Sequence, residues 1–310
     1  MKKILVAGGT GFVGTNLCKE LLRRRHFVYC LDNNITGDKK NINQFLKNKN
    51  FKYIKHDVNK FIQLDADIIF NLASPASPKQ YQIDPVYTIT TNFNGTLNLL
   101  KLAKINSSIF LQASTSEIYG DPLEHPQKES YWGNVNPIGV RSCYDEGKRS
   151  AETLCFDFIR QYSLDVKVVR IFNTYGPYLK KGDGRVISNF IYQSLKNENI
   201  TIFGSGEQTR SFCYIDDLLD GLIRTVKTKK DFNGPVNLGN PNEISMNKLA
   251  KTIIDLTKSN SKIVYKSLPQ DDPEKRKPNI SLANKTLNWK PEIDLISGLK
   301  KTIKYFKNII

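Results

Sequence analysis

The chain has 310 residues, 39% of them hydrophobic and 25% charged, with a formal net charge of +16 at pH 7. A chain of this length buries a large core and has room for two lobes. No run approaches the about eighteen apolar residues of a membrane-spanning helix, so we expect no membrane partner. No targeting segment is visible, so we expect a cytoplasmic location. The five cysteines are scattered without a CxxC pair, which is typical of neither a disulfide framework nor a zinc site, and we expect no metal.

One interpretation of the positive charge is nucleic-acid binding. The lysines are dispersed, often beside asparagine or isoleucine, and no basic block with interleaved aromatic residues occurs. We therefore expect no nucleic-acid partner. A positive cleft for an anionic substrate explains the charge as well.

The chain opens with the signals of a dinucleotide site. An apolar strand is expected at 3–7, followed by glycines at every third position in 8–14 and then by a leucine-rich helical pattern. In this context, backbone amides at the helix N-terminus bind a diphosphate. A second strand from 27 ends at Asp32, where a carboxylate bonds ribose hydroxyls and would repel a 2′-phosphate. The sequence thus predicts NAD rather than NADP.

Strands and helices alternate over the first half of the chain. This alternation predicts an α/β fold, a Rossmann-type doubly wound parallel sheet covered by helices on both faces. Further strands are expected at 51–54, 67–71, 108–113 and 166–172, and long helices at 80–104 and 144–162.

The regular alternation of strands and helices ends after Pro177. A polar, glycine-bearing loop is followed by a helix expected at 186–197, a strand at 200–203 and a helix from about 214 to 228. We predict an NAD-binding domain over 1–177, rejoined by about 211–230. We predict a smaller C-terminal lobe over 178–310 that mainly binds substrate.

Two short segments bring chemically active side chains to one end of the predicted sheet. The strand expected at 108–113 places Thr115 and Glu117 at its carboxyl end. Tyr144 and Lys148 are four residues apart and share one helix face. A hydroxyl, a carboxylate, a phenol and an ammonium therefore converge where open α/β sheets bind ligands.

These residues carry a family likeness. The 8–14 glycine turn, the Tyr144-x-x-x-Lys148 pair and Thr115 resemble the extended short-chain dehydrogenase/reductases that modify nucleotide sugars. Longer motifs, spread from Gly8 to about Pro291, resemble the UDP-glucuronate decarboxylases (UDP-xylose synthases) within that group. These motifs occupy 72–78, 114–122, 131–137, 141–149, 170–177, 182–186, 204–212, 236–241 and 270–278.

The resemblance implies a carboxy-lyase that uses NAD. UDP-glucuronate would be oxidised at C4, lose carbon dioxide as the 4-keto sugar, be protonated at C5 and be reduced again at C4 to give UDP-xylose. Tyr144 matches the family's base, Lys148 its helper and Thr115 its substrate-binding hydroxyl. Glu117 matches an additional acid/base residue, and Arg276 an arginine placed near the sugar carboxylate.

The resemblance also implies contact residues and a homodimer formed through the helices near 80–104 and 144–162. The implied substrate-binding residues are Thr115, Glu117, Tyr144, Asn173, Arg185, Phe203, Arg210 and Arg276. The implied cofactor-binding residues are Gly8, Gly11, Phe12, Val13, Gly14, Asp32, Asn33, Ile35, Thr36, Gly37, Asp57, Val58, Leu72, Ala73, Ser74, Thr91, Ala113, Tyr144, Lys148, Thr174 and Arg185.

The chemistry sets two requirements. A free phenol has a pKa of about 10, so a base at Tyr144 needs a lower pKa, and we expect Lys148 and the oxidised nicotinamide to lower it. A step at C5 needs a second acid/base group, which Glu117 supplies, whereas C4 epimerisation needs none. Ser116 stands where a 4,6-dehydratase would show aspartate, which argues against dehydration.

Alternatives remain open. A UDP-sugar 4-epimerase, or a decarboxylase that releases the 4-keto pentose, uses much of the same site. A catalytically silent NAD-binding regulator need not keep Thr115, Tyr144 and Lys148, and an RNA-binding protein would depend on the net charge. The chain departs from the family pattern at Thr90, where lysine is usual, and at Val140, where proline is usual.

Overall fold

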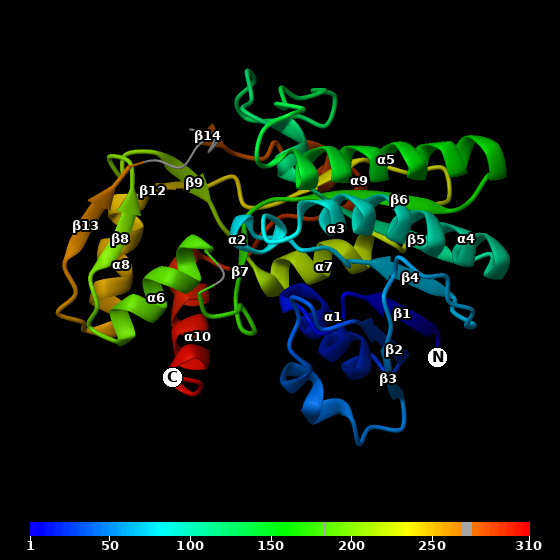
Figure 1. Ribbon diagram of the computed structural model, residues 1–310, viewed down its shortest axis with the longest axis horizontal. Coiled ribbons are helices and arrows are strands. Elements are labelled where there is room, and N and C mark those ends of the chain that lie inside the picture. Colours follow the sequence, from blue (N-terminus) through cyan, green and yellow to red (C-terminus); the bar gives the residue numbers. More distant parts are fainter. Residues whose placement is uncertain (183, 268–274) are drawn as a thin grey trace.

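The computed structural model describes residues 1–182, 184–267 and 275–310. Seven strands form one parallel sheet, in the order β11-β6-β5-β4-β1-β2-β3 (Figure 1). The order reverses beside β1, and ligands bind at such a switch point, outside the carboxyl ends of the strands. The predicted doubly wound α/β fold is confirmed. The strands are β1 (Lys3–Ala7), β2 (Phe27–Asp32), β3 (Phe51–Lys55), β4 (Ile68–Asn71), β5 (Ile109–Thr115), β6 (Val166–Ile171) and β11 (Val236–Leu238).

Helices cover both faces of this sheet because successive side chains along a buried strand point to opposite sides. In β1, Ile4 and Val6 pack into the cluster that contains α1 (Phe12–Arg23) and α7 (Ile215–Thr225). Leu5 and Ala7 pack into the cluster on the other face. That second cluster contains α4 (Thr96–Asn106) and α5 (Ser142–Tyr162).

The single helix expected at 80–104 is wrong at its start. α2 (Pro78–Tyr81) ends early, and α3 (Pro85–Thr90) begins anew and continues through a π-helical turn, η2 (Thr91–Gly95), into α4. Pro85 lacks an N–H and suits a first helical position. The carboxylate of Asp84 caps this new start by accepting a 2.8 Å hydrogen bond from the backbone N–H of Tyr87.

The remaining elements form a smaller group at the left of Figure 1. Within the described residues they make three small sheets, of which β7 and β10 form one, and three helices. These elements are β7 (Thr174–Tyr175), α6 (Val186–Leu195), β8 (Ile200–Phe203), β9 (Thr209–Ser211), β10 (Cys213–Tyr214), β12 (Glu243–Ser245), α8 (Met246–Thr257), β13 (Ile263–Lys266), β14 (Lys275–Arg276) and α10 (Leu295–Lys307).

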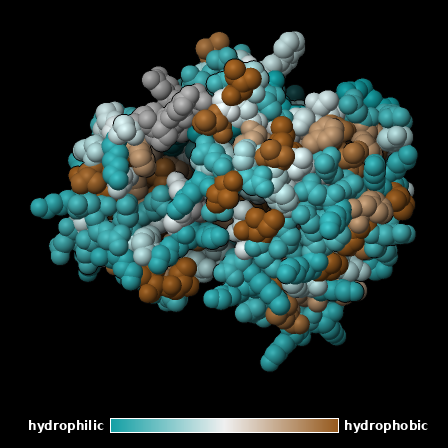
Figure 2. Space-filling model, viewed as in Figure 1, coloured by the Kyte–Doolittle hydropathy of each residue, from teal (hydrophilic) through white to brown (hydrophobic). Residues whose placement is uncertain are grey.

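The chain passes between the two groups more than once. β14 pairs with β9 so that Arg276 lies in register with Arg210, while β11 and α9 (Ser281–Leu287) belong to the main sheet and its cover. The family-like motifs at 182–186 and 270–278 fall partly outside the described residues. Within the described part of the chain, no helix is long and apolar enough to cross a membrane. Figure 2 shows this face as largely hydrophilic, with small hydrophobic groups near its centre.

Candidate active site

The glycine turn between β1 and α1 lets backbone segments approach closely. Gly8 has a φ of +80°, and a Cβ there would lie 2.8 Å from the carbonyl carbon of Leu72. A Cβ on Gly14 would lie 2.1 Å from the carbonyl oxygen of Gly8. Gly11 is the residue before α1, and no side chain caps the first turn of that helix from this position. The first N–H groups of α1 are therefore available to an anion such as a diphosphate.

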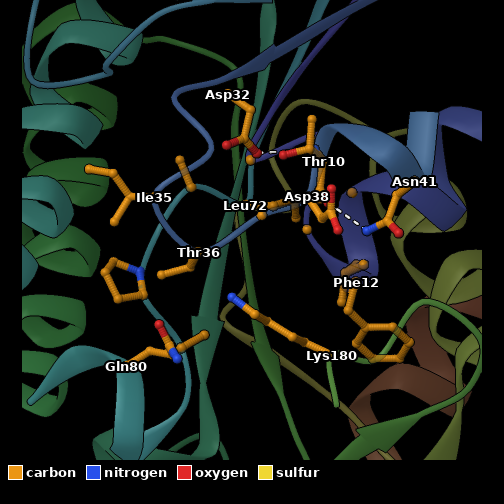
Figure 3. A pocket seen from close by; sticks show the side chains of 18 of the residues that line it. Thr10, Phe12, Asp32, Ile35, Thr36, Asp38, Asn41, Leu72, Gln80 and Lys180 are labelled. Atoms are coloured by element: carbon orange, nitrogen blue, oxygen red, sulfur yellow. Dashed lines mark hydrogen bonds between the residues drawn. The ribbon is translucent and has the colours of Figure 1, made fainter. Parts of the chain in front are cut away.

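A cavity of about 560 Å³ opens at this turn. At the end of β2, the two carboxylate oxygens of Asp32 accept hydrogen bonds from the backbone N–H groups of Thr10 (3.0 Å) and Asn34 (2.8 Å). Figure 3 shows Asp32 at one end of the cavity and the Lys180 side chain reaching into it toward Thr36. A glycine cradle, a fixed carboxylate and a cation fit a dinucleotide with two phosphates.

Most of the predicted cofactor residues line this cavity. Those that do are Gly8, Gly11, Phe12, Val13, Gly14, Asp32, Asn33, Ile35, Thr36, Gly37, Val58, Leu72, Ala73, Ser74, Thr91 and Arg185.

Asp57 does not line the cavity. Its carboxylate accepts hydrogen bonds from the Tyr87 hydroxyl (2.9 Å) and the Asn59 N–H (2.9 Å). Tyr87 does line the cavity, and its hydroxyl also accepts a 2.6 Å bond from the side-chain amide of Asn33. Asp57 therefore acts on this cavity through Tyr87, a residue that the sequence pattern did not single out.

A second cavity of about 450 Å³ shares Phe12, Val13, Leu72 and Arg185 with the first. The two cavities are thus neighbours that share part of a wall. Every predicted substrate-binding residue lines the second one: Thr115, Glu117, Tyr144, Asn173, Arg185, Phe203, Arg210 and Arg276. The predicted cofactor residues Ala113, Lys148 and Thr174 also line it, at the side nearest the main sheet.

The Glu117 carboxylate lies between two arginines. Thr115 ends β5, and its hydroxyl accepts a 3.2 Å bond from the Glu117 N–H, which starts the short turn η3 (Ser116–Tyr119). One carboxylate oxygen of Glu117 pairs with Arg276 and the other with Nη2 of Arg141 at 2.7 Å. Burial acts to raise the pKa of Glu117, but both arginines outweigh it and hold the pKa below its usual range.

Tyr144 and Lys148 lie together on α5, and both are buried. The Lys148 ammonium donates to the Ala113 carbonyl at 2.9 Å and lies 5.8 Å from the centre of the Tyr144 ring. Burial raises the pKa of Tyr144, with the Thr115 hydroxyl opposing it, and lowers the pKa of Lys148 to about 8. In the chain by itself the pKa of Tyr144 is therefore above its usual range, because desolvation dominates. The lowering expected from Lys148 together with the oxidised nicotinamide stays a prediction.

Residues 4–239 match the model of the NAD dependent epimerase/dehydratase family. The chain belongs to that family. UDP-glucuronic acid decarboxylase 1 of Xenopus tropicalis is 49% identical over 306 residues, which are 99% of this chain and 72% of the relative. UDP-glucuronic acid decarboxylase 1 of Arabidopsis thaliana is 50% identical over 308 residues, 99% of this chain and 70% of the relative. The resemblance read from the motifs is confirmed.

Solved structures of family members share the whole fold. The UDP-glucose 4-epimerase of Thermotoga maritima with UDP-glucose has a TM-score of 0.90 and 27% identity, covering 99% of each chain. The UDP-glucuronic acid 4-epimerase of Bacillus cereus, in complex with UDP-glucuronic acid and NAD, has a TM-score of 0.88 and 27% identity. That match covers 99% of this chain and 100% of the other.

Tyr81 is a further residue of the candidate site that the sequence pattern missed. The helix expected at 80–104 included it as an ordinary helical position. It lines the second cavity and is 1% exposed. Its ring stacks on Tyr144, with centroids 5.1 Å apart and planes 5° from parallel. The stack holds the Tyr144 ring from the side of α2.

A buried network supports the turn that carries Thr115 and Glu117. Arg170 donates two bonds to the Glu152 carboxylate, at 3.0 and 2.8 Å, and one to the Tyr119 hydroxyl at 3.0 Å. The Ser114 hydroxyl donates to the same carboxylate at 2.5 Å. Since Glu152 follows Lys148 by one helical turn of α5, the network ties β5, η3, β6 and α5 together behind the site.

Proposed function

We propose that this chain is an NAD-dependent UDP-glucuronate decarboxylase that produces UDP-xylose. The observation that carries the proposal is the Glu117–Arg276 pair on the wall of the cavity that also holds Thr115 and Tyr144. Beside Thr115 and Tyr144, which act at C4, the site thus has a carboxylate and an arginine that can act on C5 and its carboxylate. The sequence identity to UDP-glucuronic acid decarboxylases, 49% and 50% over 99% of this chain, supports the same reaction.

NAD suits the first cavity. The backbone of the glycine turn and the N-terminus of α1 would hold its diphosphate, and Asp32 its adenosine ribose. Arg185, whose guanidinium lies 5.9 Å from the centre of the Phe12 ring, is placed on the wall that both cavities share. When bound, NAD supplies the hydride acceptor and donor for C4.

The reaction requires oxidation before carbon dioxide leaves. A β-hydroxy acid keeps its carboxylate, whereas a β-keto acid can pass the electrons of the broken bond into its carbonyl. Tyr144 takes the proton of the C4 hydroxyl and later returns it. Thr115 hydrogen-bonds the C4 oxygen, and Lys148 lies beside the phenol as its cationic neighbour.

The substrate carries two diphosphate charges and one carboxylate. Arg210 and Arg276 lie in register on adjacent strands, so one surface presents two guanidinium groups to it. Guanidinium groups bind phosphate and carboxylate oxygens through paired hydrogen bonds. Asn173, directly before β7, and Phe203, at the end of β8, line the same cavity.

The test is product analysis. The protein is incubated with UDP-glucuronate and a catalytic amount of NAD, and carbon dioxide and nucleotide sugars are measured. We expect carbon dioxide and UDP-xylose in equal amounts. Release of UDP-4-keto-pentose would favour the alternative decarboxylase, and formation of the C4 epimer of UDP-glucuronate without carbon dioxide would favour the epimerase. NAD binding without any turnover would favour the silent regulator.

We also propose a homodimer, a cytoplasmic location and the division into the two lobes given above. Support for the homodimer is a group of exposed apolar side chains, Val86 (70%) and Phe93 (40%) on the α3–η2 segment that packs beside α5, and Ile83 (74%) just before α3. Sedimentation of wild-type protein and of a Val86→Glu variant tests it, and a monomeric wild type would contradict it. Support for the lobes is the separate grouping of the small sheets.

A further inference from the structure

The cavity at the glycine turn has more positive than negative side chains in its wall. Its charged lining residues are the cations Lys40, Lys180, Lys181 and Arg185 and the carboxylates Asp32 and Asp38. The excess of two positive charges equals the two negative charges of a dinucleotide's diphosphate, and complementary charge favours such a ligand. Among these cations, the sequence predicted only Arg185 as a cofactor contact. The lysines are therefore candidates for a contact that the sequence pattern did not assign.

The Lys180 side chain enters this cavity. Figure 3 shows its ammonium end directed toward Thr36 rather than toward Asp32. Lys181, the next residue, also borders the cavity, but its ammonium lies 4.2 Å from the centre of the Tyr192 ring on α6. Two neighbouring lysines thus differ in what their charges face, and Lys180 is the one directed into the cavity.

The segment 177–182, which we call the strap, is tied down at both ends. At its start, the side-chain amide of Asn16 on α1 donates a 2.9 Å hydrogen bond to the Pro177 carbonyl. At its end, the ammonium of Lys79 on α2 donates a 3.2 Å hydrogen bond to the Gly182 carbonyl. Both α1 and α2 contribute residues to the same cavity wall. The strap is therefore fixed to two helices that border the cofactor cavity.

Tyr178 holds the middle of the strap in a strained conformation. Its φ is +69°, in the left-handed region that residues other than glycine rarely adopt. Its hydroxyl accepts a 2.7 Å hydrogen bond from the side-chain amide of Gln44, in η1 (Lys39–Phe45). Its ring packs against Tyr305 of α10, with ring centroids 5.1 Å apart. A strained residue persists only where its surroundings outweigh the cost, so these contacts fix the strap beside Lys180.

The reaction proposed above gives a reason to hold the cofactor firmly. C4 is oxidised and then reduced within one turnover, so the hydride that leaves C4 has to return to it. Loss of the reduced cofactor between these steps would leave the sugar oxidised. A cation on the diphosphate opposes that loss, because changes at a binding surface act mostly on the dissociation rate.

We propose that Lys180 binds the diphosphate of NAD and that the strap positions its ammonium for this contact. A lysine ammonium forms charge-assisted hydrogen bonds with phosphate oxygens. Lys180 is then a cofactor-binding residue, and Tyr178 and Gln44 are positioning residues that act through it. The contact uses the cofactor of the family, and it rests on the proposed function only for the reason to retain that cofactor.

The first test measures NAD binding by calorimetry, on protein freed of nucleotide and without substrate. Lys180→Met removes the charge of an exposed side chain and keeps most of its length. The Kd for NAD should rise about tenfold, because a charge-assisted hydrogen bond is lost. The difference should shrink as salt is added, since ions screen the charge. ADP-ribose, which keeps the diphosphate and lacks the nicotinamide, should lose affinity by the same factor.

The matched control is Lys181→Met, which removes the same charge one position away and should keep a Kd close to that of wild type. An unchanged Kd in Lys180→Met would overturn the contact. An equal rise in Lys181→Met would do the same, since it would indicate a general effect of charge. ADP-ribose affinity that does not change in Lys180→Met would overturn the assignment to the diphosphate.

A second test examines the strap through Gln44, which is exposed and is not among the residues that line the cavity. Gln44→Leu removes the hydrogen bond to Tyr178 and should raise the Kd for NAD about fivefold. In a Lys180→Met background the same change should have almost no effect, because the two residues act as one unit. Equal rises in both backgrounds would overturn the positioning role.

Stopped-flow displacement of NAD completes the test. Most of the change in Lys180→Met and in Gln44→Leu should be a faster dissociation. A change confined to the association rate would overturn the retaining role of the strap. A protein that shows these effects on NAD but forms no UDP-xylose would contradict the proposed function and support the Lys180 contact.

Discussion

Arg276 forms an ion pair with Glu117 across 159 positions of the chain. Arg276 also donates a 3.0 Å hydrogen bond to the Gly120 carbonyl. It therefore contacts both the Glu117 side chain and the backbone of the turn after β5. The short strand β14 holds it there through its pairing with β9. The last part of the chain thus completes a site that begins in the main sheet.

Glu117→Gln tests the role of this carboxylate. The amide has the same shape but cannot carry a proton, so kcat for UDP-xylose formation should fall about 10²–10⁴-fold. Oxidation at C4, followed by reduced-nicotinamide absorbance in a single turnover, should fall much less. Equal loss in both steps would remove the acid/base role. NAD affinity, measured by calorimetry, is the control and should not change.

Gly14→Ala tests the glycine turn. The new Cβ would lie 2.1 Å from the Gly8 carbonyl oxygen, an overlap with backbone that forces the turn open. Overpacking of this kind costs about 1–3 kcal/mol, so NAD should bind about tenfold more weakly or worse. In Gly11→Ala the nearest atom is 3.3 Å away, and the loss should be smaller. Equal Kd values for the two variants in a calorimetric titration would contradict the role of the turn.

Lys148→Met tests the cost of burying an ammonium group. The pKa of Lys148 is about 8 in the folded chain and 10.5 when exposed, so the unfolded state binds more protons between these values. The free energy of unfolding should therefore rise with pH over that range, by up to about 3 kcal/mol, and the rise should vanish in Lys148→Met. Denaturant titrations at several pH values measure it.

Its matched control is Lys101→Met, which removes an exposed lysine from α4. That variant should keep the wild-type pH dependence. A wild-type curve that does not differ from that of Lys148→Met between pH 8 and 10.5 would contradict the lowered pKa.

Arg170→Met tests the buried network behind the site. Removing one partner of a buried ion pair leaves the Glu152 carboxylate without its bidentate partner, which costs about 3–5 kcal/mol of unfolding free energy. Arg160→Ala breaks an exposed pair with Asp157 of the same helix and should cost about 1 kcal/mol or less. Denaturant titration compares them, and similar losses would show that the buried pair contributes little.

Local spacing was sufficient for part of the site. The strand–glycine–helix order predicts the cradle at Gly8 and Gly14, because backbone approach there depends only on neighbouring residues. The four-residue spacing places Tyr144 and Lys148 on one face of α5, because helix geometry is fixed by hydrogen bonds within a few positions. Thr115 and Glu117 follow from the end of one apolar strand. The resemblance then supplied Arg276.

Only the tertiary structure decided what surrounds these groups. Arg141 pairs with Glu117 and Tyr81 stacks on Tyr144, although no spacing in the chain relates the two members of either pair. The pKa of Tyr144 rises rather than falls because desolvation depends on everything packed around the ring, not on its neighbour four positions away. The sequence by itself determined that the hydroxyl of Thr115, the carboxylate of Glu117 and the Tyr144–Lys148 pair reach the site. Their protonation depends on burial and on charges from distant segments, and these exist only once the chain has folded.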